Sequence, residues 1–308
     1  RAVRVDTDRF PTELQLSIAP GDPLAPGLLR APEMEVNLAD VSAVWYRRAA
    51  IAKRLPADLD AQTRAACLGE SRRVLFGFID GLGVYTLGGK AAVERAEIKV
   101  LQLQIARAVG LDVPRTLVSN DPAQVRAFAA RCDGALVAKM MHSFAIYDDA
   151  GNEGVVFTNP VSAADLADLD GLALCPMTFQ ERLPKARELR VTVVGDRVFA
   201  ASIDSQASPR AQHDWRRDGE RLMEDWQPTA LPTAAEEGLL RLVERLGLDY
   251  GAADFILTPD GRCVFLEINP AGEFFWLQDH PGLPIAEAIA DVLLGLAPRR
   301  AVPLYLRG

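Results

Sequence analysis

The sequence predicts a mixed α/β or α+β fold built from two or three lobes. The first observation is length, because 308 residues exceed the usual size of one simple domain. The second is an alternation between short apolar segments typical of strands and longer segments with apolar residues at helical spacing. The third is a pair of turn signatures, Gly195-Asp196 and Thr258-Pro-Asp-Gly261, which predict hairpins between neighbouring strands.

In the first third of the chain, short strands are expected at residues 3–5, 14–17 and 41–46. Proline and glycine between residues 20 and 32 interrupt this strand pattern. One helix is expected over residues 59–79, and a second over residues 91–109, closed by Gly110.

The remaining two thirds alternate between strand and helix patterns. Strands are expected at residues 115–118, 135–140, 187–194, 197–203, 252–257 and 263–268. Helices are expected at residues 122–131, 162–169, 233–246 and 285–296. Residues 148–154 carry turn chemistry between two strands, and residues 205–231 form a less regular stretch.

Composition limits the classes of function. The formal net charge is −8 and the sequence pI is about 5.1, which argues against nucleic acid as the main partner. No apolar run approaches the roughly 20 residues that span a bilayer, so no membrane partner is expected. The four cysteines are scattered and form no Cys-x-x-Cys pair, which fits a reducing, cytoplasmic location.

The residues that bear most directly on chemistry lie near the end of the chain. Glu267 and Asn269 are two positions apart on an expected strand, so their side chains point to the same face. The Pro-Asp-Gly turn brings this strand beside the one that carries Asp254. Hard oxygen ligands of this kind suit Mg²⁺ bound together with nucleotide phosphates. The alternative is that one acid is a solvated strand residue, although burying an acid on an apolar strand is costly without a cation.

Two lysines and one linker segment complete the candidate site. Lys99 lies on an expected helix, and Lys139 ends an apolar strand, from which its ammonium group can reach a phosphate in a cleft. Taken alone, each lysine fits a surface residue better than a phosphate ligand, and neither a P-loop nor a G-x-G-x-x-G motif is present. The backbone of Gln180-Glu181-Arg182-Leu183 can contact the edge of a base. Glu188 and Arg190, which follow, alternate with apolar residues and share one face.

Together these features resemble the ATP-grasp superfamily, with its paired phosphate lysines, its hinge and its terminal Asp…Glu-x-Asn metal set. More narrowly, the chain resembles the graspetide synthetases, the microviridin-type peptide ligases. The closer resemblance rests on the stretches at residues 6–12 (Asp-Thr-Asp-Arg-Phe-Pro-Thr), 44–48 (Val-Trp-Tyr-Arg-Arg), 113–122, 188–195, 203–206, 214–216 (Asp-Trp-Arg) and 265–270.

The resemblance implies three parts and a nucleotide between the last two. They are an N-terminal pre-ATP-grasp domain (1–90), a small central α/β lobe (91–177) and a C-terminal ATP-grasp lobe with the metal site (178–308). It also implies that a first strand and helix precede residue 1. The roles it carries over are phosphate binding by Lys99 and Lys139, adenine contacts through the backbones of Glu181 and Leu183, a ribose contact by Glu188, and Mg²⁺ binding by Asp254, Glu267 and Asn269.

Two departures from the family pattern stand out. The loop after Lys139 carries His142-Ser143 in place of the glycine-rich sequence of many ATP-grasp lids. The usual asparagine before the second helix is absent from residues 85–89.

As for activity, the resemblance implies an ATP-dependent ligase whose substrate is a precursor peptide with a leader and a core. An Asp or Glu of the core would be phosphorylated, and a Ser or Thr hydroxyl or a Lys amine would displace phosphate to give a macrolactone or macrolactam. Arg190 and Arg216 are candidates to stabilise the acyl phosphate and the tetrahedral intermediate, although Arg216 could instead be a salt-bridged surface residue. A homodimer is consistent with the resemblance.

Two other functions stay open. One is an ATP-grasp ligase that joins a free amino acid to a peptide or small acid, as glutathione-synthetase-like enzymes do. The other is a catalytically inactive nucleotide sensor, which the intact metal set and both lysines disfavour.

Overall fold

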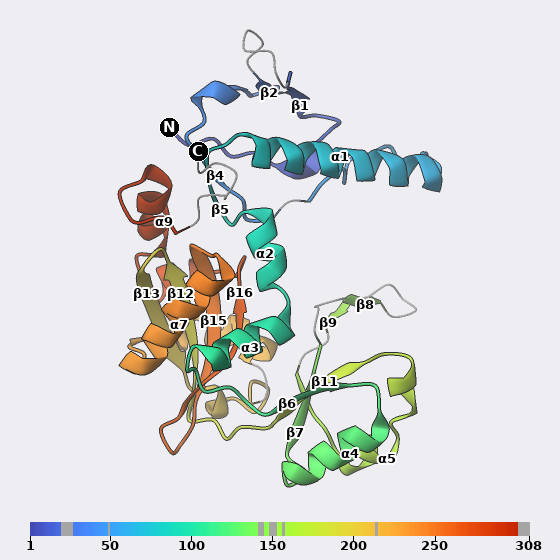
Figure 1. The fold of residues 1–308 in the computed structure, drawn as a ribbon, viewed down its shortest axis with the longest axis vertical. Helices are drawn as coiled ribbons and strands as arrows, with labels where there is room; N and C mark the ends of the chain where they lie inside the picture. Colours follow the sequence, from blue (N-terminus) through green and yellow to red (C-terminus); the bar gives the residue numbers. More distant parts are fainter. Residues whose placement is uncertain are drawn as a thin grey trace.

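The computed structural model describes residues 1–19, 27–48, 50–140, 145–147, 153–155, 158–212 and 215–300, without the side chains of 145–147, 153–155 and 220. In this part of the chain the strands form five sheets, which Figure 1 shows from the N-terminal part at the top to the central and C-terminal sheets below. The helices are α1 (Ala61–Gly81), α2 (Lys90–Ala96), α3 (Lys99–Ala108), α4 (Pro122–Arg131), α5 (Ala163–Ala167), α6 (Gly219–Leu222), α7 (Thr233–Leu246), α8 (Phe275–Asp279) and α9 (Ile285–Leu294).

The N-terminal part contains two small sheets and the long helix α1. Strands β1 (Gln15–Ser17), β2 (Leu28–Ala31) and β3 (Met34–Asn37) form an antiparallel sheet, whereas β4 (Ala43–Trp45) pairs with β5 (Tyr85–Leu87) in parallel. Helix α1 connects β4 to β5 and projects sideways from the body of the molecule (Figure 1). A connection through a helix is what a parallel pair requires.

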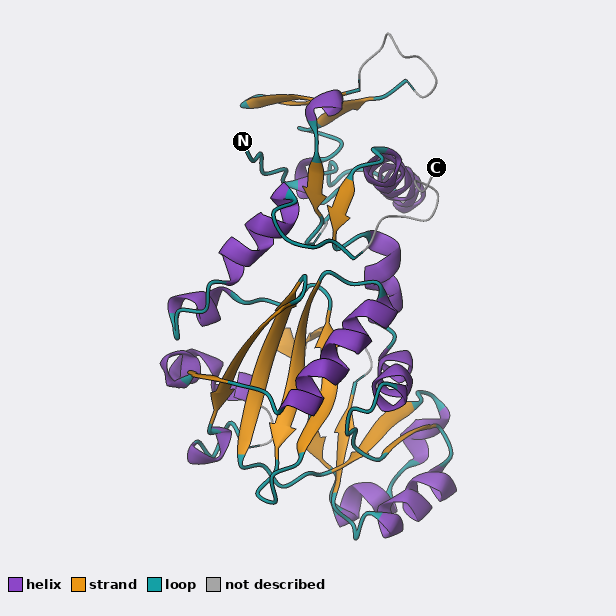
Figure 2. Ribbon diagram, turned by 60° about the vertical axis from the view of Figure 1, so that its left-hand side comes forward, coloured by secondary structure: helices purple, strands orange, loops and turns teal. Residues whose placement is uncertain are grey.

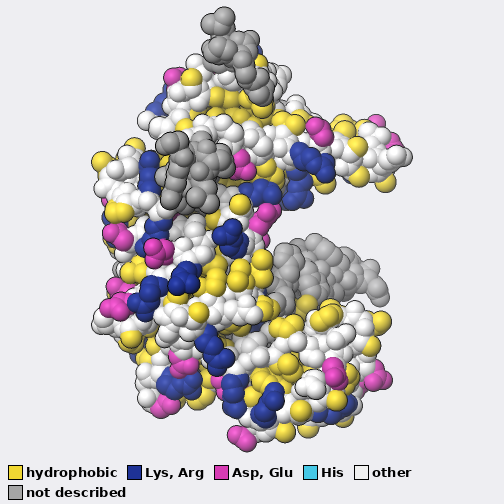
Figure 3. Space-filling view, viewed as in Figure 1, with side chains coloured by type: hydrophobic (Ala, Val, Ile, Leu, Met, Phe, Trp, Pro, Cys, Tyr) yellow, Lys and Arg dark blue, Asp and Glu magenta, His cyan; other side chains and the backbone are white. Residues whose placement is uncertain are grey.

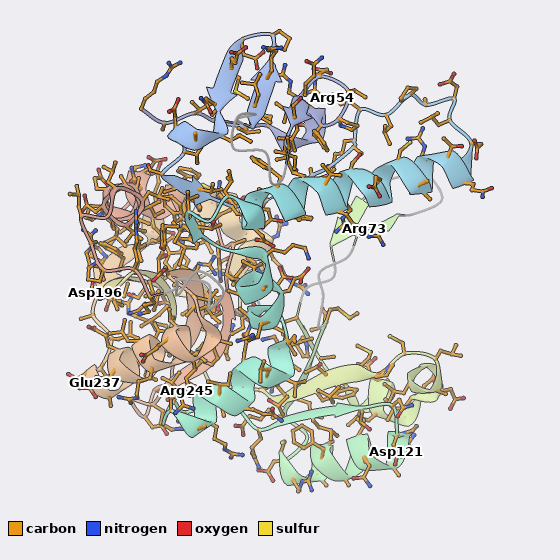
Figure 4. All side chains as sticks on the ribbon, turned by 45° about the horizontal axis from the view of Figure 1, so that its top comes forward. Arg54, Arg73, Asp121, Asp196, Glu237 and Arg245 are labelled. Atoms are coloured by element: carbon orange, nitrogen blue, oxygen red, sulfur yellow. The ribbon has the colours of Figure 1, made fainter. Side chains whose placement is uncertain are left out.

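The central sheet has the order β10-β7-β11-β6, and all its pairs are antiparallel. Its strands are β6 (Thr116–Ser119), β7 (Leu136–Lys139), β10 (Asn159–Pro160) and β11 (Met177–Glu181), with the hairpin of β8 (Ala145–Tyr147) and β9 (Glu153–Val155) inserted between β7 and β10. Leu136 and Phe179 pack with Val125 and Phe128 of α4 on one face. Asp121, labelled in Figure 4, caps α4 by accepting from the peptide N–H of Ala123 at 2.8 Å.

The C-terminal sheet has the order β14-β13-β12-β15-β16, again fully antiparallel. Its strands are β12 (Arg187–Val194), β13 (Arg197–Ile203), β14 (Gln227–Thr229), β15 (Tyr250–Leu257) and β16 (Cys263–Asn269). Apolar residues of α7 and α3 cover one face, as Figure 2 shows for the helices in front of the strands. Because side chains alternate along β12, Leu189, Val191 and Val193 face this core while Glu188 and Arg190 point to the opposite face.

The structure confirms the mixed α/β fold class and most of the expected elements. The helices over residues 122–131 and 233–246 and the strands over residues 187–194 and 197–203 have the expected bounds. Strands β2, β3, β5, β10 and β14 and helices α6 and α8 were missed. Strand β2 lies within residues 20–32, where proline and glycine were expected to interrupt the strand pattern, and it pairs with β3 through a turn at Pro32.

Two expectations were wrong. Residues 3–5 form no strand, because the small sheet is completed by β2 and β3. Residues 91–109 form two helices instead of one, since Ile98 is extended (φ −73°, ψ 93°) and turns the chain between α2 and α3. The side-chain amide of Gln102 donates to the peptide oxygen of Ala96 and so satisfies the end of α2.

In the described part of the chain, no helix combines the length and the apolar character that crossing a bilayer requires.

The packing of α7 on the C-terminal sheet predicts a local difference in sensitivity to substitution. Leu239 on α7 is fully buried, whereas Leu294 at the end of α9 is 71% exposed. Leu239→Ala should lower the free energy of unfolding by about 2–5 kcal/mol, because it leaves a cavity in the core. Leu294→Ala should change it by less than about 0.5 kcal/mol. Urea unfolding of both variants checks this, and equal effects would contradict the packing described.

Candidate active site

A row of charged side chains crosses the face of the C-terminal sheet that is opposite α3 and α7. The strand register places Arg190 opposite Asp254, and Asp254 opposite Glu267. Arg190 Nη1 donates to both carboxylate oxygens of Asp254, at 2.9 and 3.1 Å. Like charges directly opposite each other on neighbouring strands are destabilising, so the two facing carboxylates need nearby cations.

Lys99 supplies one of these cations from α3. Its Nζ lies 2.7 Å from Glu267 Oε2. Burial alone would raise the pKa of Glu267, but the positive charges of Lys99, Lys139 and Arg216 outweigh this effect and lower it to about 2. Glu267 is therefore ionised throughout the neutral range and is available as an anionic ligand.

Asn269 shares the face of Asp254 and Glu267, as expected from the sequence. The register shifts between Asp254 and Phe255, where β16 carries one extra residue, and Asn269 then lies opposite Ala252. The bulge allows Phe265 to face the core while Glu267, two positions later, faces the cleft. Asn269 Oδ1 also accepts from the peptide N–H of Ala271 at 3.0 Å, which fixes the orientation of the amide.

Sequence reasoning missed Gln102, which orients the strand that carries these ligands. Gln102 is 1% exposed and lies one turn after Lys99 on α3. Its side-chain amide donates to the peptide oxygen of Ile268 at 2.8 Å and accepts from the peptide N–H of Ile268 at 2.9 Å. It thus takes the place of a neighbouring strand at the edge of β16. In the sequence, this role of Gln102 was indicated only by its position on the same face of an amphipathic helix as Lys99.

The expected hinge follows β11. Gln180 is buried and donates to Thr116 Oγ1 at 3.0 Å, and the peptide N–H of Arg182 donates to Ala135 at 2.8 Å. The peptide N–H of Arg115 donates to the side-chain Oε1 of Glu181 at 2.9 Å. Leu183 is buried, and in the described part of the chain its peptide N–H donates to no protein acceptor.

A cavity of about 400 Å³ joins the hinge to the charged row. Its apolar lining includes Val137, Ile256 and Leu266. Its lining also brings together most of the sequence-predicted residues, namely Lys139, Gln180, Glu181, Arg182, Leu183, Glu188, Arg216, Asp254 and Glu267. This volume lies in the range of about 300–1,000 Å³ that is typical of small-molecule sites.

Glu188 and the two arginines differ in how they are held. Glu188 Oε1 accepts from Lys185 Nζ at 3.0 Å, and both side chains are largely buried. Arg190 also donates to the peptide oxygen of Glu273 at 3.3 Å and lies 5.5 Å from the centre of the Trp276 ring. Arg216 lies on the 3₁₀ helix Trp215–Asp218 and lines the cavity, so it is not only a surface residue.

A second hollow of about 550 Å³ lies between α3 and the open face of the central sheet. Its basic lining comprises Lys99, Arg107, Arg115, Arg131 and Lys139. Figure 3 shows Lys and Arg side chains gathered along this side of the molecule, over α2, α3 and the central sheet. The chain therefore has a positively charged cleft despite its net charge of −8.

The donor set fits Mg²⁺ that shares its ligands with phosphate. Asp254, Glu267 and Asn269 offer oxygen donors. Among the described residues, no group of three or more Asp, Glu, His or Cys side chains is placed to hold a metal ion by itself. Mg²⁺ is usually held by one or two carboxylates together with substrate phosphates, not by an all-protein cage. His142-Ser143 in the expected lid and Asp214 of the Asp-Trp-Arg stretch lie outside the described residues.

Comparisons with known proteins agree with this geometry. A family model described as the MvdD pre-ATP grasp domain matches residues 1–93. A RiPP-associated ATP-grasp ligase of Chryseobacterium gregarium, solved in complex with ADP and a leader and core peptide, is 43% identical over 97% of this chain and 90% of that chain, with a TM-score of 0.92. The macrocyclase MdnC of Microcystis aeruginosa MRC, solved with the precursor peptide MdnA, is 45% identical over 96% of this chain and 92% of that chain, with a TM-score of 0.86.

More distant similarity points to a neighbouring group of ligases. A probable alpha-L-glutamate ligase of Shewanella amazonensis is 26% identical over 232 residues, which cover 74% of this chain and 73% of that protein. The two solved structures are more similar and match over almost the whole chain. The chain therefore belongs to the family of RiPP-associated ATP-grasp ligases that its motifs resemble.

Proposed function

We propose that this protein is an ATP-dependent ligase that activates Asp or Glu side chains of a ribosomal precursor peptide and closes them into ester or amide cross-links. The observation that carries this proposal is the pair of facing carboxylates, Asp254 and Glu267, at the end of a cavity that begins at the hinge. Such a pair suits Mg²⁺ on a nucleotide, and relatives with the same fold have been solved with ADP and precursor peptides.

The nucleotide would lie between the central and C-terminal sheets. Glu181 and Leu183 would contact adenine through their backbones, with Gln180 and Arg182 fixing the hinge on either side. Glu188 would contact the ribose, and Lys99 and Lys139 the phosphates. Bound Mg²⁺, held by Asp254, Glu267 and Asn269, would supply neutralisation of the phosphate charge.

The chemistry follows from the weakness of a carboxylate as an electrophile. A carboxylate oxygen attacks the γ-phosphorus of ATP, and the bond to the β-phosphate oxygen breaks to release ADP. A hydroxyl or amine then attacks the acyl phosphate, loses its proton and displaces inorganic phosphate. Arg190 and Arg216 would stabilise the negative charge of the acyl phosphate and the tetrahedral intermediate. Most of the rate enhancement then comes from positioning and charge neutralisation.

The peptide is the second substrate. We propose that the chain has three lobes, at residues 1–90, 91–177 and 178–308. The precursor peptide would contact more than one of them. MdnC and the ligase from C. gregarium were solved with such peptides. The four cysteines are free thiols, which supports the expected cytoplasmic location. The similarity to alpha-L-glutamate ligases keeps transfer of a free amino acid as the second candidate.

Mass spectrometry of the precursor peptide from the same locus tests the proposed function directly. Incubation with the protein, ATP and Mg²⁺ should remove one water for each cross-link formed. Mild base should reverse the loss for esters and not for amides. Glu267→Gln should give no loss, because it removes a charged ligand. An unchanged peptide with ADP released only when free amino acids are supplied would favour the second candidate.

Arg190 should matter for chemistry more than for nucleotide binding. Arg190→Ala should slow cross-link formation by at least about 100-fold, since charge stabilisation in the transition state is lost. Its affinity for ADP should stay within about twofold of the wild type. Arg197→Ala is the matched control, because Arg197 of β13 pairs with Asp291 of α9, away from the cavity. Normal turnover of Arg190→Ala would rule out this role.

The charge of Lys99 should affect how the free energy of unfolding depends on pH. The pKa of Glu267 lies near 2, below its ordinary value of 4.5, so the ionised group stabilises the fold above about pH 4.5, and this contribution is lost as the pH falls toward 2. Lys99→Met should raise the pKa of Glu267 and lower the stability near neutral pH. The variant should then lose less stability than the wild type between pH 4.5 and 2.

Urea unfolding in EDTA at a series of pH values measures this difference. Lys90→Met is the control, because Lys90 pairs with the exposed Glu94 one turn away on α2. Parallel stability curves for the wild type and Lys99→Met would show that Lys99 does not set the pKa of Glu267.

A further inference from the structure

We propose that Arg115 and the side chain of Glu181 are positioning residues that make the hinge selective for adenine over guanine. This inference rests on the proposed binding of a nucleotide at the hinge and adds the residues that determine which base is accepted. Neither side chain needs to touch the base for this role.

Between β11 and the segment before β6, a side-chain hydrogen bond replaces one of the backbone hydrogen bonds. The peptide N–H of Glu181 donates to the peptide oxygen of Arg115 at 3.0 Å. In a regular antiparallel pair, the peptide N–H of Arg115 would donate back to the peptide oxygen of Glu181. Here it donates to the side-chain Oε1 of Glu181 at 2.9 Å instead. The Glu181 carboxylate thus accepts the hydrogen bond that the Glu181 peptide oxygen would otherwise accept. The peptide oxygen is left available to a ligand.

The Arg115–Glu181 clamp holds the carboxylate in place. Arg115 Nε donates to Glu181 Oε2 at 2.6 Å, so both oxygens of the carboxylate are engaged by the same residue. Arg115 Nη1 donates in turn to the peptide oxygen of Arg131 at the end of α4. The Glu181 side chain is only 14% exposed. Charge-assisted bonds of this geometry are stronger than neutral ones and restrict rotation of both side chains.

The peptide groups of residues 181–183 alternate in direction along the hinge. The peptide N–H of Arg182 donates to Ala135 on the opposite side, which turns the carbonyl of Glu181 and the N–H of Leu183 toward the same side. Leu183 is 9% exposed, and among the described residues its N–H donates to none. Because Leu183 lines the cavity, an acceptor atom of a bound ligand can pair with this N–H.

The edge of adenine matches this acceptor–donor pair. Its exocyclic amino group would donate to the carbonyl of Glu181, and its N1 would accept from the N–H of Leu183. Guanine presents a carbonyl oxygen at the first position and an N–H at the second, so both contacts become repulsive. The selectivity depends on the Glu181 carbonyl staying free, and the Arg115–Glu181 clamp ensures this.

Binding of ADP and GDP by isothermal titration calorimetry, with Mg²⁺ and the full chain, tests the inference. Glu181→Ala removes the carboxylate, so the N–H of Arg115 can return to the Glu181 carbonyl. The affinity for ADP should fall by about tenfold, while that for GDP changes by less than about threefold. Arg115→Ala should shift the ratio in the same direction. Glu181→Gln keeps a side-chain oxygen for the Arg115 N–H and should retain most of the selectivity.

Arg126→Ala is the matched control. Arg126 lies on the same lobe, and within the described part of the chain its side chain hydrogen-bonds to the peptide oxygens of Leu166 and Ala167, away from the hinge. Equal losses of ADP and GDP affinity in Glu181→Ala, or an unchanged ratio, would overturn the positioning role. If the wild type binds neither nucleotide, the proposed function itself fails, which separates the two outcomes.

Discussion

Two negatively charged side chains, Asp254 and Glu267, face each other across neighbouring strands, and much of the surrounding structure compensates for their repulsion. Arg190 approaches from β12 and Lys99 from α3, so each carboxylate has a cation of its own. These ion pairs hold the two acids in place, and Mg²⁺ together with phosphate would compete for the same oxygens. The ion pairs also explain why Arg190 and Lys99 are found on different elements, since no single element reaches both sides of the row.

Close approach of the backbone is a further condition for this arrangement. Gly272 follows β16, the strand that carries Glu267 and Asn269. A Cβ atom at this position would lie 2.8 Å from Arg190 Nη2 and 2.5 Å from the Cβ of Ala252. Contacts this short are not tolerated, so the position excludes larger side chains. The bulge in β16 is a second such condition, because without it Glu267 would face the apolar core.

The sequence was sufficient for the fold class, the family and the residues that meet in the cavity, because all three depend on local patterns. Asp254, Glu267 and Asn269 could be grouped from a turn and a two-residue spacing alone. The break between α2 and α3 could not be predicted, since it depends on Gln102 reaching Ala96 and Ile268 at the same time. The hydrogen bond from the Arg115 N–H to the Glu181 side chain could not be predicted either, because Arg115 is 66 positions away in the chain.

The attachment of α3 has a mechanical consequence. Gln102 fastens this helix to the edge of β16, so Lys99 is held against the C-terminal sheet, whereas Lys139 is the last residue of a strand in the central sheet. Any rotation of one sheet against the other therefore changes the distance between the two ammonium groups. A polyphosphate bound by both would therefore connect the C-terminal sheet to the central sheet.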